Sequence, residues 1–224
     1  MRAFDAAIFD MDGLLIDSEP LWQQAEINCF RPLGVPITPE ICMATAGRRL
    51  DEVLACWYER FGWQGPSVEE MHARVLEEVT RLMMARGEPL PGVNQQMKAL
   101  GNAGLKLAIA SSSPPALIEA VVDKLNLADH LALTHSGTHE ARGKPDPAVF
   151  LTTARLLGVD PARCLVFEDA PAGVEAGHRA GMHVIAVPSV FDHADPGFLL
   201  ARQVLNSLED FCLSATEQAL ARGD

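Results

Sequence analysis

The stretch that decides the fold stands near the start of the chain, Ala6-Ala7-Ile8-Phe9-Asp10-Met11-Asp12-Gly13-Leu14-Leu15. Its short apolar run predicts a buried strand that ends in two acids and a glycine. Residues two apart on an extended segment share a face, so Asp10 and Asp12 point into one small volume unless the turn at Gly13 diverts the second. Two anions that close repel, and a hard divalent cation or a shared proton relieves the repulsion. The alternative is a strand end whose acids simply face water.

The composition is that of a globular protein with room for one domain plus an insertion, or for two domains. The chain has 224 residues, of which 48% are hydrophobic and 21% charged. The net charge of -12 and the lack of any Lys/Arg-rich run disfavour a nucleic-acid partner, because phosphate backbones select basic surfaces. A phosphorylated substrate would therefore need local positive charge.

The cysteines and the apolar runs bear on where the protein works. The 5 cysteines form no Cys-x-x-Cys pair, and an odd count suits a reducing compartment better than a disulfide framework. The first strand begins within a few residues of Met1, which leaves no room for a signal peptide. No apolar run approaches membrane-spanning length. We expect a soluble, cytoplasmic protein without a membrane partner.

The segment after the opening strand carries helical signals and no convincing strand. Helices are predicted from Pro20 to Phe30, with Ser18 as a candidate N-cap, and over Leu50 to Phe61. Ser67-Val68-Glu69-Glu70 is a capping box, and apolar residues at three- and four-residue spacing follow it. This part of the chain is therefore expected to be all-helical.

A run dense in glycine and proline, residues 86–92, breaks the last of these helices and indicates a hinge. The opening strand has no helix of its own before this hinge except the helical block. The simplest arrangement is an insertion, with a helical cap domain over 17–88 and a core domain built from 1–16 and 89–224. The cap would then sit as a lid over the strand ends.

Beyond the hinge, short apolar runs alternate with helical segments. The predicted order is helix Val93 to Ala103, strand Leu105 to Ala110, helix Pro115 to Leu125, strand Leu131 to Thr134, helix Pro147 to Leu157, strand Cys164 to Phe167, helix Ala172 to Ala180 and strand His183 to Val187. Such alternation predicts an α/β fold with a doubly wound parallel sheet. We expect Val204 to Phe211 to add an edge strand and a last helix.

Polar residues follow the predicted strands at the edge where open parallel sheets bind ligands. Serines at 111–113 follow one strand, Glu168 and Asp169 follow another, and Lys144 lies in the loop after a third. Each has an ordinary alternative: a helix cap, a solvated lysine or an acidic turn. Their placement after successive strands favours a shared site.

This set of residues suits phosphoryl transfer. A carboxylate can attack phosphorus to form an acyl phosphate, and a second acid can protonate the departing alkoxide and later take a proton from water. Ser111, Ser112 and the backbone N–H groups before Pro114 can hold phosphate oxygens, with Lys144 as a point charge. The remaining carboxylates can hold magnesium, whose charge offsets the clash between two anions.

These motifs resemble the four-motif signature of the haloacid dehalogenase superfamily over nearly the whole chain. The matching residues are Asp10-Met11-Asp12-Gly13, Ser111, Lys144-Pro145, Glu168-Asp169, Ala172-Gly173 and Ala180-Gly181-Met182. The resemblance implies a Rossmann-like core with Asp10 as nucleophile and magnesium ligand. It implies that Asp12 is the acid/base and a ligand through its backbone carbonyl.

The same resemblance assigns the other site residues. Ser111 and Lys144 would hold phosphate, Asp169 would bind Mg²⁺ directly, and Glu168 would bind it directly or through water. The insertion resembles the helical cap of the β-phosphoglucomutase-like branch, and the sequence from Phe9 to Trp22 is similar to that of sugar-phosphate phosphatases.

Departures from the family pattern narrow the activity. Dehalogenases of this superfamily lack the second aspartate, so Asp12 speaks against halide removal. The similar mutases carry a histidine on the helix entering the cap where this chain has Trp22, which favours hydrolysis over isomerisation. Trp22 suits packing at the cap hinge, the role we favour, or lining the sugar pocket. Arg48 and Arg49 are candidates for substrate contact, and a solvated arginine pair is the alternative.

The sequence therefore predicts a magnesium-dependent phosphatase of small sugar or sugar-alcohol phosphates that works through a phosphoaspartate. A phosphomutase that uses the same phosphoaspartate is the first alternative. A receiver-like phosphoacceptor is the second, but such domains place the aspartate after the third strand, where this chain has Thr134-His135-Ser136-Gly137. The physiological leaving group and the oligomeric state stay open, and a monomer is plausible.

Overall fold

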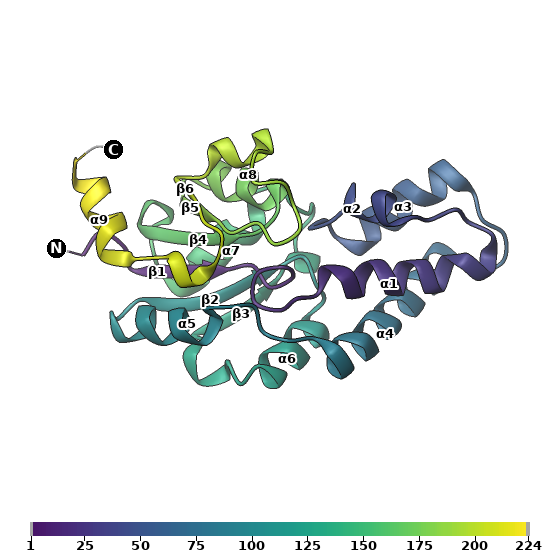
Figure 1. Ribbon diagram of the computed structural model, residues 1–224, viewed down its shortest axis with the longest axis horizontal. Helices are drawn as coiled ribbons and strands as arrows, with labels where there is room; N and C mark the ends of the chain where they lie inside the picture. The colour runs from purple at the N-terminus through teal and green to yellow at the C-terminus, as the bar shows by residue number, and fades with distance from the viewer. Residues whose placement is uncertain (1, 223–224) are drawn as a thin grey trace.

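The computed structural model describes residues 2–222 and contains a six-stranded parallel sheet (Figure 1). The strands lie in the order β3-β2-β1-β4-β5-β6, so the chain reverses its winding direction at β1. Open sheets of this kind form a ligand crevice where the order reverses, at the carboxyl ends of the strands. The strands are β1 (Ala6–Phe9), β2 (Lys106–Ser111), β3 (Leu133–Ser136), β4 (Cys164–Glu168), β5 (His183–Ala186) and β6 (Gln203–Val204).

Alternation along β1 divides the core into two layers. Ala7 and Phe9 belong to one apolar cluster and Ala6 and Ile8 to the other, because successive side chains of a strand point to opposite faces. All four side chains are fully buried. Helices α5 (Val93–Asn102), α6 (Pro115–Lys124) and α9 (Leu213–Arg222) supply the first cluster, and α7 (Ala148–Leu157) and α8 (Pro171–Arg179) supply the second.

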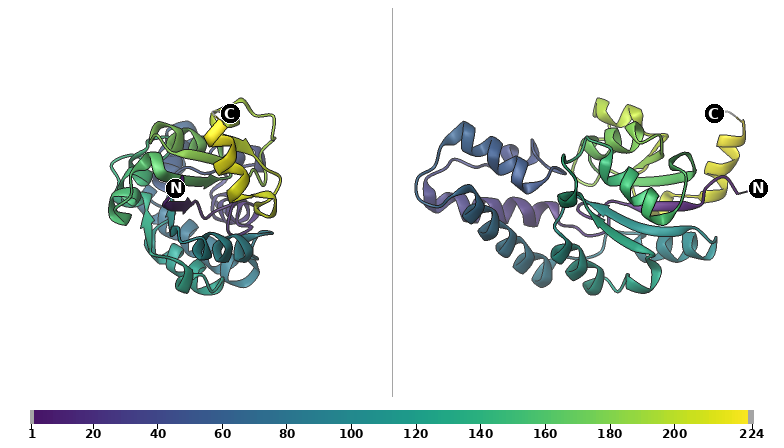
Figure 2. Two further views of the ribbon diagram at one scale, coloured as in Figure 1. Left: turned by 90° about the vertical axis from the view of Figure 1, so that its left-hand side faces the viewer. Right: turned by 180° about the vertical axis from the view of Figure 1, so that it is seen from behind.

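Four helices between β1 and α5 form a second lobe beside the sheet, called the cap here (Figures 1 and 2). An apolar cluster of its own holds this lobe together. The Phe30 ring makes edge contacts with the Trp57 and Trp63 rings at centroid distances of 5.5 and 5.1 Å. The cap helices are α1 (Glu19–Phe30), α2 (Pro39–Met43), α3 (Leu50–Phe61) and α4 (Val68–Arg86).

The chain enters and leaves the cap through two adjacent extended segments. The backbone N–H of Asp17 donates to the carbonyl of Glu88 at 2.9 Å, and that of Leu90 donates to the carbonyl of Leu15 at 3.2 Å. Leu21 of α1 and Val79 of α4 also belong to the apolar cluster under α5 and α6. The inner ends of both helices are thus packed against the core, and the segment between α2 and α3 also meets it, where the Ser112 hydroxyl donates to the carbonyl of Gly47.

The expected α/β fold with a doubly wound parallel sheet is confirmed, and three local predictions need correction. The third strand starts at Leu133 instead of Leu131, because Leu131 still caps a 3₁₀ turn at Ala128–His130. Ser18 stands at the N-cap of α1, but its hydroxyl makes no cap hydrogen bond. The predicted C-terminal element at 204–211 is a two-residue strand and a 3₁₀ turn, and the last helix begins at Leu213.

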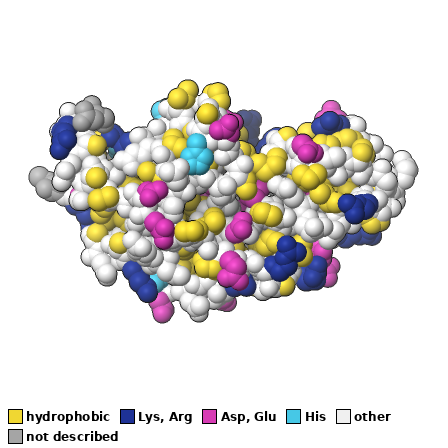
Figure 3. Space-filling model, viewed as in Figure 1, with side chains coloured by type: hydrophobic (Ala, Val, Ile, Leu, Met, Phe, Trp, Pro, Cys, Tyr) yellow, Lys and Arg dark blue, Asp and Glu magenta, His cyan; other side chains and the backbone are white. Residues whose placement is uncertain are grey.

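Charged side chains are scattered over the face shown in Figure 3, which carries no continuous basic patch among the described residues. This agrees with the net charge of -12. None of the described helices has the length and apolarity needed to span a membrane.

Candidate active site

Asp10, Lys144 and Glu168 meet in a buried group at the carboxyl ends of β1 and β4. The backbone N–H of Asp10 donates to the carbonyl of Phe167 at 2.9 Å, which continues the strand pairing and sets Asp10 beside Glu168. The Lys144 ammonium donates to Oδ1 of Asp10 at 2.5 Å and to Oε1 of Glu168 at 2.6 Å. All three side chains are at most 7% exposed. Solvent therefore screens these charges very little.

Burial controls the protonation of this group. It raises the pKa of Asp10 to about 8, with the charges of Glu168 and Asp12 adding to the effect and Lys144 opposing it. Burial by itself would lower the pKa of Lys144, but the two flanking carboxylates hold it above its usual range. One lysine does not neutralise the cluster, because Asp169 is buried beside it as well.

Asp10, Glu168 and Asp169 could hold a metal ion. One carboxylate oxygen of each lies within 4.8 Å of the other two. Oδ2 of Asp169 is buried and has no hydrogen-bond partner among the described residues, and burial raises the Asp169 pKa well above its usual value. An all-oxygen set of buried carboxylates, one of which has an oxygen without a hydrogen-bond partner in the part of the chain that the structure describes, is the donor set that a hard divalent cation takes. The site therefore fits Mg²⁺.

Two glycines make the space that these carboxylates occupy. A Cβ on Gly13, whose φ is +71°, would lie 2.2 Å from Oδ2 of Asp169. A Cβ on Gly173 of α8 would lie 2.0 Å from the Glu168 carboxylate. Neither approach is possible for a residue with a side chain, so both glycines are needed for the acids to gather here.

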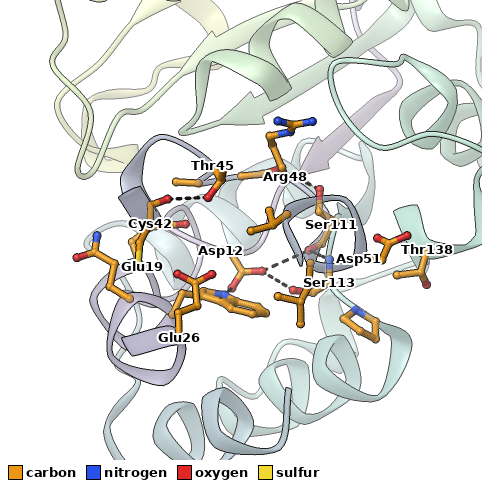
Figure 4. Close-up of a pocket in the computed structure, with 18 of the residues that line it drawn as sticks. Asp12, Glu19, Glu26, Cys42, Thr45, Arg48, Asp51, Ser111, Ser113 and Thr138 are labelled. Carbon is orange, nitrogen blue, oxygen red and sulfur yellow. Dashed lines mark hydrogen bonds between the residues drawn. The ribbon is translucent and has the colours of Figure 1, made fainter. Parts of the chain in front are cut away.

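Asp12 lies in a different environment from Asp10. Oδ1 of Asp12 accepts hydrogen bonds of 2.8 Å from the Ser18 hydroxyl and from the indole N–H of Trp22. Oδ2 accepts one of 2.7 Å from the Ser113 hydroxyl, and the Ser111 hydroxyl lies at 3.5 Å (Figure 4). The Asp12 carboxylate is thus held by neutral donors, whereas Asp10 is bound by the Lys144 ammonium.

The serine loop after β2 serves both Asp12 and the cap. Ser111 is fully buried, and its hydroxyl oxygen accepts the backbone N–H of Ser113 at 3.0 Å. The Ser112 hydroxyl donates to the carbonyl of Gly47 in the cap at 3.1 Å. Of the three hydroxyls, that of Ser113 makes the shortest bond to Asp12, although the sequence analysis does not single it out.

A pocket opens between this loop and the cap. Asp10 and Asp12 line it from the core, and α1 lines it through residues that include Glu19 and Glu26 (Figure 4). The residues that line it are Asp10, Asp12, Glu19, Trp22, Gln23, Glu26, Cys42, Thr45, Ala46, Gly47, Arg48, Leu50, Asp51, Val53, His72, Ser111, Ser112, Ser113, Pro114 and Thr138.

The guanidinium of Arg49, a candidate for substrate contact, bonds to core carbonyls and to a neighbouring carboxylate. Nη1 of Arg49 donates to the carbonyls of Gly137 and Glu140 at 3.3 and 2.7 Å, and Nε and Nη2 bind the Asp51 carboxylate. Gly137 and Glu140 belong to the core, so Arg49 ties the cap to the core. The neighbouring Arg48 lines the pocket instead.

Several residues of the pocket stand outside the sequence motifs. Trp22, for which packing or lining the pocket was expected, does both, and its indole N–H also donates to Asp12, a bond that the sequence does not predict. Glu19 and Glu26 line the pocket from α1 and His72 lines it from α4. The spacing of Glu19, Trp22 and Glu26 on a predicted helix places them on one face, and this was the available signal.

Known proteins share both the sequence and the fold. A family model described as haloacid dehalogenase-like hydrolase matches residues 4–181. Hexitol phosphatase B of Escherichia coli (strain K12) is 40% identical over 210 residues, which cover 93% of this chain and 95% of the relative. A phosphorylated carbohydrates phosphatase of Thermotoga maritima is 33% identical, and the match covers 81% of this chain and 83% of the relative.

A solved structure, that of β-phosphoglucomutase from Clostridium difficile, superposes with a TM-score of 0.85 over 98% of both chains. At 21% identity, this likeness shows the fold alone. The phosphatase relatives are the closer guide to activity, because their identity is higher and extends over most of the chain. The chain therefore belongs to the haloacid dehalogenase-like hydrolases, and within them it is a phosphatase of sugar phosphates.

Proposed function

We propose that Asp10 attacks the phosphorus of a hexitol or hexose phosphate and carries the phosphoryl group until water removes it. The observation that carries this proposal is the different setting of the two aspartates. Asp10 lies among the metal-binding acids, whereas Asp12 is held by hydroxyl and indole donors at the same pocket. Two carboxylates in contrasting environments can divide nucleophile and acid/base roles between them.

Asp12 is the proposed acid/base. In the first step it gives a proton to the sugar oxygen as the O–P bond breaks, and in the second it takes a proton from the attacking water. Its donors come from two segments, Ser18 and Trp22 from the start of α1 and Ser113 from the serine loop. They fix its orientation toward the pocket, which a proton transfer in both directions requires.

Lys144, Ser111 and the backbone N–H groups of the serine loop are the proposed phosphate holders. Lys144 already touches Asp10, so a phosphoryl group on that carboxylate would lie within reach of the ammonium. Hydrolases of this family generally use Mg²⁺, and a Mg²⁺ ion held by Asp10, Glu168 and Asp169 would offset the negative charge of the ester and the nucleophile. A ligand role for the Asp12 backbone carbonyl stays part of the proposal.

The leaving group is proposed to be a hexitol or a hexose, held under the cap over 17–88. The pocket walls come mainly from the cap, and relatives of the chain are a hexitol phosphatase and a phosphorylated carbohydrates phosphatase. Five free cysteines among the described residues support a reducing, cytoplasmic location.

The test is a phosphate-release assay run with product analysis on sorbitol 6-phosphate, mannitol 1-phosphate, glucose 6-phosphate and glucose 1-phosphate, with Mg²⁺ present. Inorganic phosphate should appear in step with substrate loss. Conversion of glucose 1-phosphate to the 6-phosphate with little free phosphate would instead establish the phosphomutase alternative.

A further inference from the structure

One face of α1 lines the pocket from the catalytic acids outward. Glu19, Trp22, Gln23 and Glu26 stand at i, i+3, i+4 and i+7, so they share a face, and all four line the pocket. A helix rises about 1.5 Å per residue, which separates the first and last of them by roughly 10 Å along the axis. The hydrogen bond from Trp22 to Asp12 places this face directly beside the proposed acid/base. Polar groups therefore extend away from the reaction centre in a row.

Two members of this row are buried carboxyls without cationic partners. Glu19 is 5% exposed and Glu26 is 7% exposed. No hydrogen bond or ion pair joins the Glu19 side chain to another described residue, and Asp12, Glu26, Asp10 and Asp17 are the charges that act on it. Burial raises the pKa of Glu19 to about 8. A buried carboxyl that faces a pocket and lacks a partner is stabilised when a ligand supplies one.

Glu26 has one neighbour of its own, the buried Cys42 thiol of α2. Burial raises the pKa of Glu26 to about 7. A thiol is a weak donor, so most of the hydrogen-bonding capacity of this carboxyl stays available to the pocket. Arg48, the arginine of the pocket wall, is 41% exposed, and its Nη2 lies 3.8 Å from Oε2 of Glu52. The α1 side of the pocket is therefore polar and acidic, and Arg48 and His72 are the basic side chains in the rest of its lining.

We propose that Glu19, Gln23 and Glu26 form a subsite for the hydroxyl groups of an uncharged open-chain polyol, and that this subsite rejects a leaving group that ends in an anion. The inference rests on the proposed function and names the substrate class within it. A hydroxyl both donates and accepts, so it pairs with a carboxyl in either protonation state and with the Gln23 amide. An anion would add a further negative charge beside Glu19 and Glu26, and Arg48, the arginine of the pocket lining, is already in an ion pair with Glu52.

The test compares two substrates that differ only at the far end. Sorbitol 6-phosphate and 6-phosphogluconate are open six-carbon chains with the same phosphate ester, but the second ends in a carboxylate. The wild-type protein should hydrolyse sorbitol 6-phosphate with a kcat/KM larger by about tenfold or more, the effect of one unfavourable charged contact. Equal kcat/KM values for the two substrates would overturn the inference without the need for any variant.

At pH 8, above the Glu26 pKa of about 7, the variant Glu26→Gln keeps the size of the side chain and removes its charge. In this variant the ratio of kcat/KM for sorbitol 6-phosphate to kcat/KM for 6-phosphogluconate should fall by at least about threefold. The fall should come mainly from a lower KM for 6-phosphogluconate. Gln24→Ala, on the exposed side of the same helix, is the matched control and should leave the preference unchanged. Hydrolysis of p-nitrophenyl phosphate, which does not reach along α1, reports whether each variant is folded and active.

The two proposals fail in different ways. If the wild-type protein hydrolyses p-nitrophenyl phosphate but neither six-carbon ester, the substrate class of the proposed function is wrong and the subsite falls with it. If sorbitol 6-phosphate is a good substrate and Glu26→Gln leaves the preference unchanged in an active protein, only the subsite is wrong.

Discussion

The indole N–H of Trp22 donates a hydrogen bond of 2.8 Å to the carboxylate of Asp12, which joins the first helix of the cap to the proposed acid/base of the core. An indole can only donate, so it orients the carboxylate without exchanging a proton. Trp22 is therefore a positioning residue, and the orientation of Asp12 depends on where α1 stands.

The variant Trp22→Phe should lower kcat for sorbitol 6-phosphate by about tenfold, because it keeps an aromatic side chain but loses one hydrogen bond to a charged group. The loss should be smaller for p-nitrophenyl phosphate, whose leaving group needs little protonation. Trp63→Phe is the matched control, since the Trp63 indole donates to the Pro66 carbonyl within the cap. An equal loss on both esters would argue against an effect through Asp12.

Variants of the two aspartates should differ in whether a phosphoenzyme can be trapped. Asp12→Asn should still form a phosphoenzyme from p-nitrophenyl phosphate, since that leaving group departs without a proton. Asp10→Asn should form none, because the nucleophile is gone. Intact-protein mass spectrometry after acid quench gives the readout, and a phosphoenzyme in Asp10→Asn would exclude the assignment.

Gly13→Ala should abolish magnesium binding, since the new Cβ would lie 2.2 Å from Oδ2 of Asp169. Mg²⁺ should raise the thermal midpoint of the wild-type protein through mass action and leave that of the variant unchanged. Gly34→Ala is a matched control, because Gly34 has the same φ of +71° and no atom within 4 Å of the added Cβ. It should lose about 1 kcal/mol of stability to backbone strain and keep the Mg²⁺ shift. An unchanged shift in Gly13→Ala would contradict the metal site.

Arg49→Ala should loosen the cap from the core, because the guanidinium donates to the carbonyls of Gly137 and Glu140 across this contact. Each such bond is worth about 1 kcal/mol, so amide exchange in residues 137–143 should quicken by about fivefold or more. Arg81→Ala, whose ion pair with Glu78 lies within α4, should leave that exchange unchanged. Equal exchange in both variants would show that Arg49 does not hold the cap.

Glu26 should make stability fall as pH rises. Burial raises its pKa from 4.5 to about 7, so between these values the folded state binds more protons than the unfolded state, and the free energy of unfolding decreases with pH. The contribution is roughly 3 kcal/mol at most. Glu26→Gln should therefore be more stable than the wild-type protein at pH 8, by a margin that shrinks at pH 5.5.

Urea denaturation at the two pH values measures this margin. Besides Glu19 on its own helix, the group that acts on Glu26 is the Cys42 thiol of α2, which stays neutral over this range because its pKa is raised. Gln24→Ala is again the control. A margin that is the same at pH 5.5 and pH 8 would show that the Glu26 carboxyl is charged throughout.

The strand ends explain how much of the site could be predicted from the sequence. Parallel strands bring their carboxyl ends to one edge, so apolar runs followed by Asp10, Ser111 and Glu168-Asp169 predict a common site wherever the strands pair. The helical insertion could be predicted too, because the capping box at Ser67 and the break at 86–92 are local signals. Local propensity and the two-residue period of a strand depend only on residues that are near one another in the sequence.

The partners of Asp12 and Arg49 were decided only by the tertiary structure. Asp12 lies 101 residues from Ser113, and Arg49 lies 91 residues from Glu140, yet both pairs are hydrogen-bonded. Periodicity tells which face of a helix or strand a residue occupies, but not which distant segment that face meets. The angle of the cap on the core sets this meeting. It directs Arg49 to the core loop, Arg48 to the pocket and the Trp22 indole to the acid/base.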